Sequence, residues 1–227
     1  IVLVPNSVEE TLFLTYEACR LSQKYLTPVA LMLDEIIGHM EEPIEIPKLD
    51  PVPMNPDAMI MGNGHRFHRT GLTHNLDNFL PSINPDTQEK VVGHLLDKVK
   101  KDAHKLVNYE GLGSLAEAEL IIVCYGSESR SVKAAMKCLG DQTRVAVMRL
   151  ITAWPFPKEV IQELDRPGKT FLVAEVNAGQ IRAELERYVK KGDVQGFHLM
   201  GGRIHTPGEV LDRVGRIVEQ PPLVSNA

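Results

Sequence analysis

The chain has 227 residues, 43% of them hydrophobic and 24% charged, which suits one large or two small domains with ordinary hydrophobic cores. The formal net charge of -5 and the absence of a basic run give no electrostatic reason to bind nucleic acid or an anionic membrane. The longest apolar runs, such as 120–125, fall far short of the roughly 20 residues that cross a bilayer.

The chain opens on an apolar run, Ile1–Val4, that predicts a buried strand. Because it has no initiator Met and no basic leader, we expect the sequence to be a fragment. Ser7 and Glu10 then have the spacing of a capping box, which predicts a helix to about Leu26. Thr27-Pro28 ends this helix before a second strand at 29–33. The apolar face predicted for the helix consists of Val8, Leu12, Tyr16 and Cys19.

Polar residues follow the second strand at its carboxyl end, over 34–40. Open α/β sheets carry their functional groups at this edge, so Glu35 and His39 are candidate sheet-edge or interface residues. Five prolines between Pro43 and Pro56 then predict an extended linker and a domain boundary, because so many prolines exclude helix and central strand.

The long polar loop that follows the linker, 59–82, carries candidate functional residues. Its candidate metal ligands are His65, His68, His74 and Asp77. We expect no metal there, because the spacing matches no zinc pattern and Arg66 and Arg69 add positive charge. Two alternatives stay open: a solvated loop, or a loop over a partner's active site. In the second case the substrate-proximal residues are His65, Arg66, His68 and Arg69, since guanidinium groups pair with carboxylates and phosphates.

The remaining residues predict a doubly wound α/β domain. A capped helix begins at Pro85 and is expected to continue to about Val107. Its apolar positions are Val92, Leu95, Leu96, Val99 and Leu106. Strands are then expected at 119–124, 143–149, 170–176 and 195–199, and helices at 128–139, 158–165, 179–190 and 207–218. This alternation is typical of a mainly parallel sheet with helices on both faces.

The three cysteines, Cys19, Cys124 and Cys138, are too dispersed for an iron-sulfur or zinc site. We expect each of them to be a small buried hydrophobic residue in a reducing, cytoplasmic compartment. No cluster is expected on this chain.

Several turns could carry chemistry, and each also has a structural interpretation. Gly126-Ser127 and Gly201-Gly202-Arg203 could offer backbone N–H groups to an anion, although a plain turn is favoured for both. Trp154 and Phe156 are expected to pack in the core. For Glu175 and Asn177, a role at a subunit interface and simple capping of the next helix stay equally open.

Two motifs carry a resemblance to a known family: Thr152-Ala153-Trp154-Pro155-Phe156-Pro157 and Ala174-Glu175-Val176-Asn177-Ala178-Gly179-Gln180-Ile181. Both resemble the α chain of the 2-oxoacid:ferredoxin oxidoreductases, thiamine-diphosphate and iron-sulfur enzymes that oxidise 2-oxoacids to acyl-CoA. Residues 5–10, 25–29 and 33–40 look like the last third of the pyrimidine-binding domain of these chains. Residues 110–218 resemble the transketolase carboxyl-terminal domain.

The resemblance implies three segments: a partial pyrimidine-binding domain at 1–42, a linker and loop at 43–84, and a transketolase carboxyl-terminal-like domain at 85–227. It implies thiamine diphosphate and magnesium shared with a β subunit, iron-sulfur clusters in partner subunits, and CoA as co-substrate. Electrons would pass to ferredoxin, and γ and δ subunits or an α homodimer would complete the assembly. It transfers no catalytic residue to this chain, and no cofactor is expected on the isolated chain. Gln180 joins the sheet-edge candidates through the second motif.

Segments 34–40 and 62–80 look closest to members that use 2-oxoglutarate or branched-chain 2-oxoacids. Two other interpretations stay open. One is a non-catalytic module for subunit assembly, and the other is a thiamine enzyme of the dehydrogenase or transketolase group. The two motifs argue against the last of these.

Overall fold

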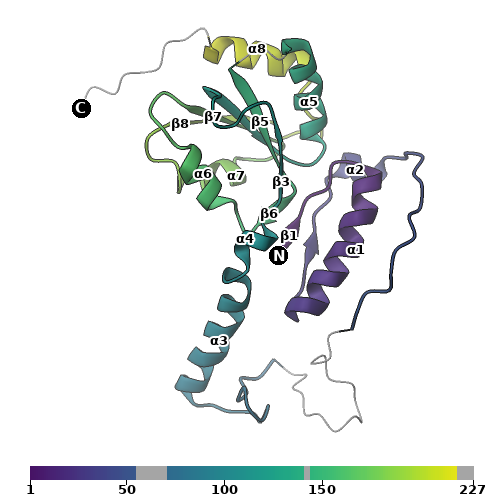
Figure 1. The fold of residues 1–227 in the computed structure, drawn as a ribbon, viewed down its shortest axis with the longest axis vertical. Helices are drawn as coiled ribbons and strands as arrows, with labels where there is room; N and C mark the ends of the chain where they lie inside the picture. The colour runs from purple at the N-terminus through teal and green to yellow at the C-terminus, as the bar shows by residue number, and fades with distance from the viewer. Residues whose placement is uncertain (55–70, 141–143, 219–227) are drawn as a thin grey trace.

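The computed structural model describes residues 1–54, 71–140 and 144–218, which build two separate sheets (Figure 1). The smaller sheet has three strands in the order β2-β1-β6. The larger has five strands in the order β3-β5-β4-β7-β8. No helix in these three ranges is long and apolar enough to cross a membrane.

The first part of the chain forms the expected strand-helix-strand unit. It consists of β1 (Val2–Leu3), α1 (Val8–Tyr25), β2 (Ala30–Leu31) and the short helix α2 (Glu35–His39). The Ser7 side chain accepts a hydrogen bond from the Glu10 amide at 3.0 Å, and Leu26 ends α1 in the left-handed conformation. β1 pairs in parallel with β2 and antiparallel with β6 (Thr152–Trp154). A strand from the second half of the sequence therefore completes the first sheet.

The predicted apolar face of α1 is wrong. Cys19 is exposed, and the side that packs into the core carries Leu14, Ala18, Leu21 and Tyr25. These residues meet Ile1 and Leu3 of the small sheet. The helix has apolar residues on both sides, so periodicity alone could not select the buried one.

The long helix expected at 85–107 is interrupted. It divides into α3 (Pro85–Lys100) and α4 (Ala103–Leu106). At the break, the Asp102 carboxylate accepts hydrogen bonds from the Tyr25 hydroxyl and the Lys105 ammonium, both at 2.8 Å. These contacts tie the break to the carboxyl end of α1.

The five-stranded sheet has helices on both faces, as the doubly wound prediction requires. Its strands are β3 (Tyr109–Leu112), β4 (Leu120–Cys124), β5 (Val145–Leu150), β7 (Thr170–Glu175) and β8 (Asp193–His198). Its helices are α5 (Glu128–Leu139), α6 (Lys158–Leu164), α7 (Gln180–Glu186) and α8 (Pro207–Val218). α6 and α7 cover one face, and α5 and α8 cover the other (Figure 1). The edge strand β3, which was not predicted, runs antiparallel to β5.

Several single residues differ from expectation. Cys124 is fully buried, but Cys19 and Cys138 are exposed because they lie on the outer sides of α1 and α5. Phe156 is buried and stacks on Tyr188, whereas Trp154 is 47% exposed on the small sheet. The core prediction is therefore confirmed for Cys124 and Phe156 and wrong for Cys19, Cys138 and Trp154.

A buried lysine immediately before β7 should make the stability of the fold change with pH in the alkaline range. Lys169 is 1% exposed, and its ammonium donates to the carbonyl oxygens of Leu115 at 2.7 Å and Ala116 at 3.3 Å. Burial, together with the nearby charge of Arg166, lowers the pKa of Lys169 from 10.5 to about 8. Between these two values the unfolded chain holds the proton and the folded chain has released it.

Stability should therefore rise with pH between about pH 8 and 10.5, by about 1–2 kcal/mol relative to Lys169→Met, which cannot titrate. Urea unfolding of both proteins across this range measures the difference. The exposed-site variant Lys137→Met is the matched control and should follow the wild type. Parallel curves for wild type and Lys169→Met would contradict the expectation.

Candidate functional site at the carboxyl edge of the large sheet

The order of strands places a topological switch point between β4 and β7. The chain leaves β4 towards β5 on one side and leaves β7 towards β8 on the other. Ligands of open α/β sheets bind outside the carboxyl ends of such strands. The loops at this position, 125–127 and 176–179, are therefore the candidate site.

Glu175 occupies the carboxyl end of β7 and is almost completely buried, with 1% exposure. Its carboxylate accepts hydrogen bonds from the backbone amides of Ile181 at 3.0 Å and Arg182 at 3.1 Å. It also accepts from the Tyr125 hydroxyl at 3.3 Å, and His198 Nε2 lies 3.5 Å from it. The carboxylate thus satisfies the open amides in the first turn of α7.

Tyr125 joins the two loops of the switch point. Its hydroxyl contacts the Glu175 carboxylate and also accepts a hydrogen bond from the Asn177 side-chain amide. Burial, followed by the charge of Glu175, raises the pKa of Tyr125 above its ordinary value. The phenol is therefore a neutral donor that holds the carboxylate, and it cannot act as a base near neutral pH.

Asn177 and Gly179 shape the turn into α7. The Asn177 side-chain oxygen accepts from the amides of Gly179 at 2.7 Å and Gln180 at 3.1 Å. Gly179 has φ = +101°, and a Cβ there would lie 2.8 Å from the ring of His198. Both features require glycine. The family motif therefore performs helix capping in this structure, while the Gln180 side chain is exposed.

At the second loop, where α5 starts, a carboxylate from the first part of the chain binds a backbone amide. Asp34 Oδ2 accepts from the Ser127 amide at 2.7 Å, and Asp34 Oδ1 accepts from the Ile37 amide at 3.0 Å. Gly126 has φ = +57°, and a Cβ there would lie 2.6 Å from Asp34 Oδ2. The anion suggested for this helix start is thus the protein's own carboxylate.

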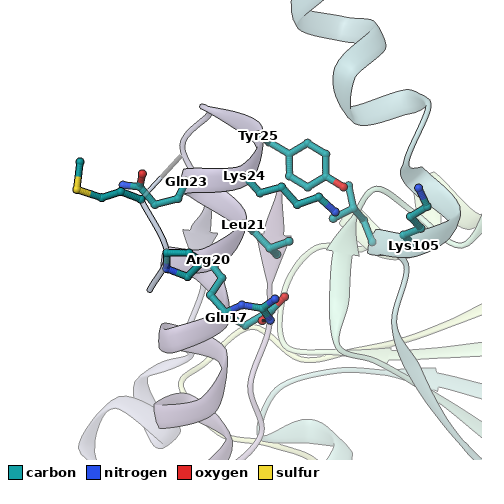
Figure 2. A pocket seen from close by; sticks show the side chains of 10 residues that line it. Glu17, Arg20, Leu21, Gln23, Lys24, Tyr25 and Lys105 are labelled. Carbon is teal, nitrogen blue, oxygen red and sulfur yellow. Dashed lines mark hydrogen bonds and ion pairs between the residues drawn. The ribbon is translucent and has the colours of Figure 1, made fainter. Parts of the chain in front are cut away.

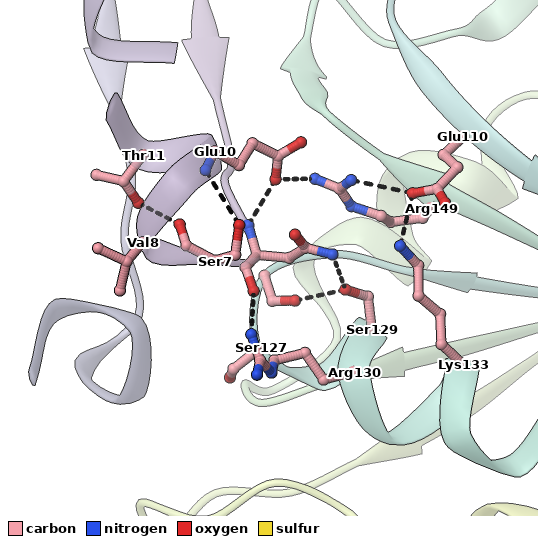
Figure 3. Close-up of polar contacts among 12 residues, drawn as sticks. Ser7, Val8, Glu10, Thr11, Glu110, Ser127, Ser129, Arg130, Lys133 and Arg149 are labelled. Carbon is pink, nitrogen blue, oxygen red and sulfur yellow. Dashed lines mark hydrogen bonds and ion pairs between the residues drawn. The ribbon is translucent and has the colours of Figure 1, made fainter. Parts of the chain in front are cut away.

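A polar network near the starts of α1 and α5 joins the two parts of the chain (Figure 3). Arg149, with 4% of its side chain exposed, pairs with Glu10 of α1 and with Glu110 of β3, the latter at 3.1 Å. Lys133 approaches the same Glu110 carboxylate at 2.7 Å. Burial opposes the ionised form, yet Lys133 and Arg149 together lower the pKa of Glu110 below its ordinary value. Glu110 is therefore ionised at neutral pH.

The same junction continues through α5. The Asn6 side-chain amide donates to Ser129 Oγ at 3.1 Å, and Arg130 pairs with Glu42 at 3.0 Å. The Glu42 carboxylate also accepts from the Val8 amide at 3.0 Å. The start of α1 and the start of α5 are therefore held together by side chains from both.

A second buried acid, Glu128, lies one residue beyond Ser127. Its carboxylate accepts from the His205 amide at 3.1 Å and lies 2.9 Å from His205 Nδ1, and the imidazole stacks on Phe197. Burial raises the pKa of Glu128, against the opposing effect of His205. Burial also raises the pKa of the adjacent Cys124 thiol, which excludes a reactive thiolate at neutral pH. The buried Glu128–His205 pair therefore links the start of α5 to the segment before α8.

The other sequence candidates are scattered. Glu35 and His39 are exposed on α2 and do not join the Asp34 contacts. His74 stacks on Phe79, and Asp77 is exposed. Arg203 forms a two-point pair with Glu209 and is not presented to a phosphate. His65, Arg66, His68 and Arg69 lie outside the described residues.

No group of three His, Cys, Asp or Glu side chains in the described ranges is arranged to hold a metal. A diphosphate at the switch point would need the amides that start α5 and α7, and Asp34, Glu175 and Asn177 already occupy several of them. Within these ranges the edge does not fit a diphosphate.

A cavity of about 420 Å³ lies away from the switch point, between α1 and α4 (Figure 2). Arg20, Lys24 and Lys105 lie around it, together with apolar groups such as Leu21 and Leu106. The Tyr25 hydroxyl that borders it is held by Asp102, and burial with this contact raises the pKa of Tyr25 to about 12. The cavity therefore lies between two basic helix ends, and the Tyr25 hydroxyl beside it stays neutral near neutral pH.

Sequence reasoning missed Asp34, Arg149 and Glu110 as members of the junction. A charged residue within the buried run of β5 was the available signal, because a buried guanidinium requires partners. The partners themselves are far away in sequence, so spacing could not identify them.

Comparison with known proteins gives the same family over both parts. Residues 1–92 match the family model of the thiamine-diphosphate-binding domain of pyruvate flavodoxin/ferredoxin oxidoreductase. Residues 118–210 match that of pyruvate:ferredoxin oxidoreductase core domain II.

Curated relatives extend the match. The chain is 36% identical to 2-oxoglutarate synthase subunit KorA of Methanocaldococcus jannaschii, over 92% of this chain and 62% of that protein. It is 33% identical to the KorA subunit of Methanothermobacter marburgensis, over 94% and 63% of the two chains. It is also 33% identical to ketoisovalerate oxidoreductase subunit VorB of the same organism, over 96% and 60%. The chain thus spans about three fifths of the length of these relatives.

A solved structure supports the fold. The 2-oxoglutarate:ferredoxin oxidoreductase from Magnetococcus marinus, determined with 2-oxoglutarate, coenzyme A and succinyl-CoA bound, superposes with a TM-score of 0.79 at 23% identity. The match covers 96% of this chain and 42% of that one. The family models and the curated relatives agree along nearly the whole sequence. The chain belongs to the 2-oxoacid:ferredoxin oxidoreductase family, in which it corresponds to part of an α subunit.

Proposed function

We propose that this chain is part of the α subunit of an enzyme that oxidatively decarboxylates a 2-oxoacid, with 2-oxoglutarate as the preferred substrate. With CoA as the acyl acceptor, the products are an acyl-CoA, carbon dioxide and two electrons for ferredoxin. The observation that carries the proposal is the match to 2-oxoglutarate synthase α subunits at 33–36% identity across 92–94% of the chain. The second candidate substrate is a branched-chain 2-oxoacid, favoured by the 33% identity to the ketoisovalerate enzyme.

We propose that thiamine diphosphate and magnesium are held jointly with a β subunit. Asp34 and Glu175 of this chain already accept hydrogen bonds from backbone amides at the switch point. This supports a cofactor site shared with the β subunit, because the diphosphate would have to be bound elsewhere. The remaining proposed partners are γ and δ subunits, ferredoxin reached through the complex, and iron-sulfur clusters carried by partner subunits. CoA is the proposed co-substrate, and the cytoplasm is the proposed compartment.

The three segments 1–42, 43–84 and 85–227 are retained as the proposed domain organisation. Their contribution to the enzyme is to shape the site and to hold subunits together. Glu35, His39 and Gln180 support this role, because their side chains are exposed on α2 and α7 and are accessible to a neighbouring subunit.

Reconstitution with the partner subunits tests the substrate proposal. Ferredoxin reduction with CoA is measured for 2-oxoglutarate, for ketoisovalerate and for pyruvate. We expect kcat/KM to be highest with 2-oxoglutarate. A preference for ketoisovalerate would support the second candidate, and a preference for pyruvate would contradict both.

The guanidinium groups of Arg66 and Arg69 are proposed to bind the carboxylates of the 2-oxoacid. Replacement of either by Ala should lower kcat/KM by about tenfold to a hundredfold, equivalent to about 1.5–3 kcal/mol for an unpaired substrate carboxylate. Steady-state kinetics of the reconstituted enzyme measure this loss. Arg187→Ala, which removes an exposed guanidinium on the other domain, is the control. Unchanged kinetics in both loop variants would show that these side chains are solvated surface groups.

A further inference from the structure

A cavity of about 370 Å³ lies at the amino edge of the large sheet, at the opposite end of the strands from the switch point. It is bordered by the starts of β4 and β7, by the turn before β7 and by the end of α8. The charged residues that line it are Glu119, Arg144, Arg166 and Lys169. Three cationic residues and one acidic residue thus surround this space.

Two of these cations have neutral partners. The Arg166 guanidinium and the Lys169 ammonium donate to carbonyl oxygens of residues 115–118, at distances of 2.7–3.3 Å. No carboxylate of a described residue pairs with either group, whereas Glu119 pairs with Arg144. The cavity therefore borders two positive charges that no described residue neutralises.

These two positive charges repel each other. Lys169 is 1% exposed, and burial, followed by the charge of Arg166, lowers the pKa of its ammonium to about 8. A buried charge without a counter-charge costs free energy, which a bound anion would offset. Donors for such an anion are present, because both hydrogen bonds of Arg166 come from Nη2 and its Nε and Nη1 donate to no described residue.

The charge of the cavity indicates which anion it takes. Three cations and one carboxylate leave two positive charges around it. A phosphomonoester carries close to two negative charges at neutral pH, whereas a carboxylate carries one. Gly168, in the turn beside the two cations, has φ = +80°, and nothing lies within 4 Å of a Cβ placed there. A phosphate group can therefore approach this turn without a steric clash.

We propose that this cavity is a binding site for a phosphate group, either free phosphate or a phosphomonoester, with Arg166 and Lys169 as its principal ligands and Arg144 as the exposed cation at its rim. Guanidinium and ammonium groups both suit phosphate oxygens. Leu120 and Ile217 supply apolar walls, which strengthen ion pairs by lowering the local dielectric constant. The inference is independent of the proposed catalytic function.

Phosphate binding should raise the pKa of Lys169, because a bound anion stabilises the ammonium form. NMR titration of the lysine Cε signals in the isotope-labelled 227-residue chain measures this pKa, and the signal of Lys169 is the one absent from Lys169→Met. In chloride at constant ionic strength it should titrate at about 8. In millimolar phosphate the midpoint should rise by about one pH unit, equivalent to tenfold tighter binding to the ammonium form.

Two further ligands define the chemistry of the site. Methyl phosphate at the same concentration separates the two sources, because the ligand that gives the larger shift is the one that the site prefers. Acetate should give a clearly smaller shift, since it carries only one charge.

Variants of the lining residues test the same site by calorimetry. Arg166→Gln should weaken phosphate binding about tenfold, because it removes a charged donor. Glu119→Gln should tighten binding about threefold or more, since it removes the one carboxylate that lines the cavity, and a gain of affinity cannot result from misfolding. Arg187→Gln, which removes an exposed guanidinium at the end of α7, is the matched control and should bind phosphate like the wild type.

Equal phosphate affinities for the wild type, Arg166→Gln and Glu119→Gln would show general attraction to surface charge and would overturn the proposal. A Lys169 pKa that does not respond to either phosphate ligand, or that responds equally to acetate, would overturn it as well.

Discussion

Replacement of Glu175 by alanine should lower the free energy of unfolding by about 3–5 kcal/mol, the largest effect we expect from one side chain. The carboxylate is 1% exposed and accepts from the amides of Ile181 and Arg182 and from the Tyr125 hydroxyl. Alanine leaves these donors buried without an acceptor. Urea unfolding monitored by circular dichroism measures the loss.

Two further variants test whether the loss comes from the missing acceptor oxygens or from any substitution in this turn. Glu175→Gln keeps one acceptor oxygen at the same place and should recover part of the loss. Gln180→Ala removes an exposed side chain from the same turn and should change the free energy of unfolding by about 0.5 kcal/mol or less. A loss below about 1 kcal/mol in Glu175→Ala would show that the carboxylate is not what holds the start of α7.

Asp34→Ala should be the second most damaging change, with a loss of about 2–5 kcal/mol. Asp34 satisfies the amide of the buried Ser127 and the amide of Ile37, and so links α2 to α5. Removal of the carboxylate frees the amide at the start of α5, where an anion can be bound. We therefore expect millimolar sulfate to raise the stability of Asp34→Ala more than that of the wild type.

Thermal unfolding with and without sulfate, beside the same concentration of chloride, tests this expectation. Asp34→Asn is the matched variant, because its amide oxygen can still accept from one backbone N–H. It should lose less stability and respond less to sulfate. Equal sulfate effects on wild type and Asp34→Ala would contradict an anion-type role for the Asp34 carboxylate.

The large sheet could be predicted from sequence because its signals are local. Apolar runs such as Leu120–Cys124 and Thr170–Glu175 alternate with capped amphipathic helices, and these patterns place the strands to within a few residues. The edge strand β3 was missed, because its run Tyr109–Leu112 is short and contains a glycine. The break between α3 and α4 was missed, because no proline or glycine marks it and the Asp102 side chain there contacts Tyr25, which is distant in sequence.

The candidate site could be predicted only in part, because some of its contacts join residues that are distant in sequence. Asn177 and Gly179 act within their own turn, so a capping role could be anticipated for them. Asp34 and Arg149 act across the junction between the two parts, on amides and carboxylates that no spacing rule connects to them. The buried side of α1 could not be predicted either, because the small sheet selects it through long-range packing.

This chain is not expected to hold thiamine diphosphate alone, because at the described switch point its own carboxylates occupy the amides that could bind the diphosphate. Titration calorimetry of the isolated chain with thiamine diphosphate and magnesium tests this most directly. We predict no binding heat from the chain alone, and binding once the β subunit is added. Micromolar binding of thiamine diphosphate by the isolated chain would contradict the account.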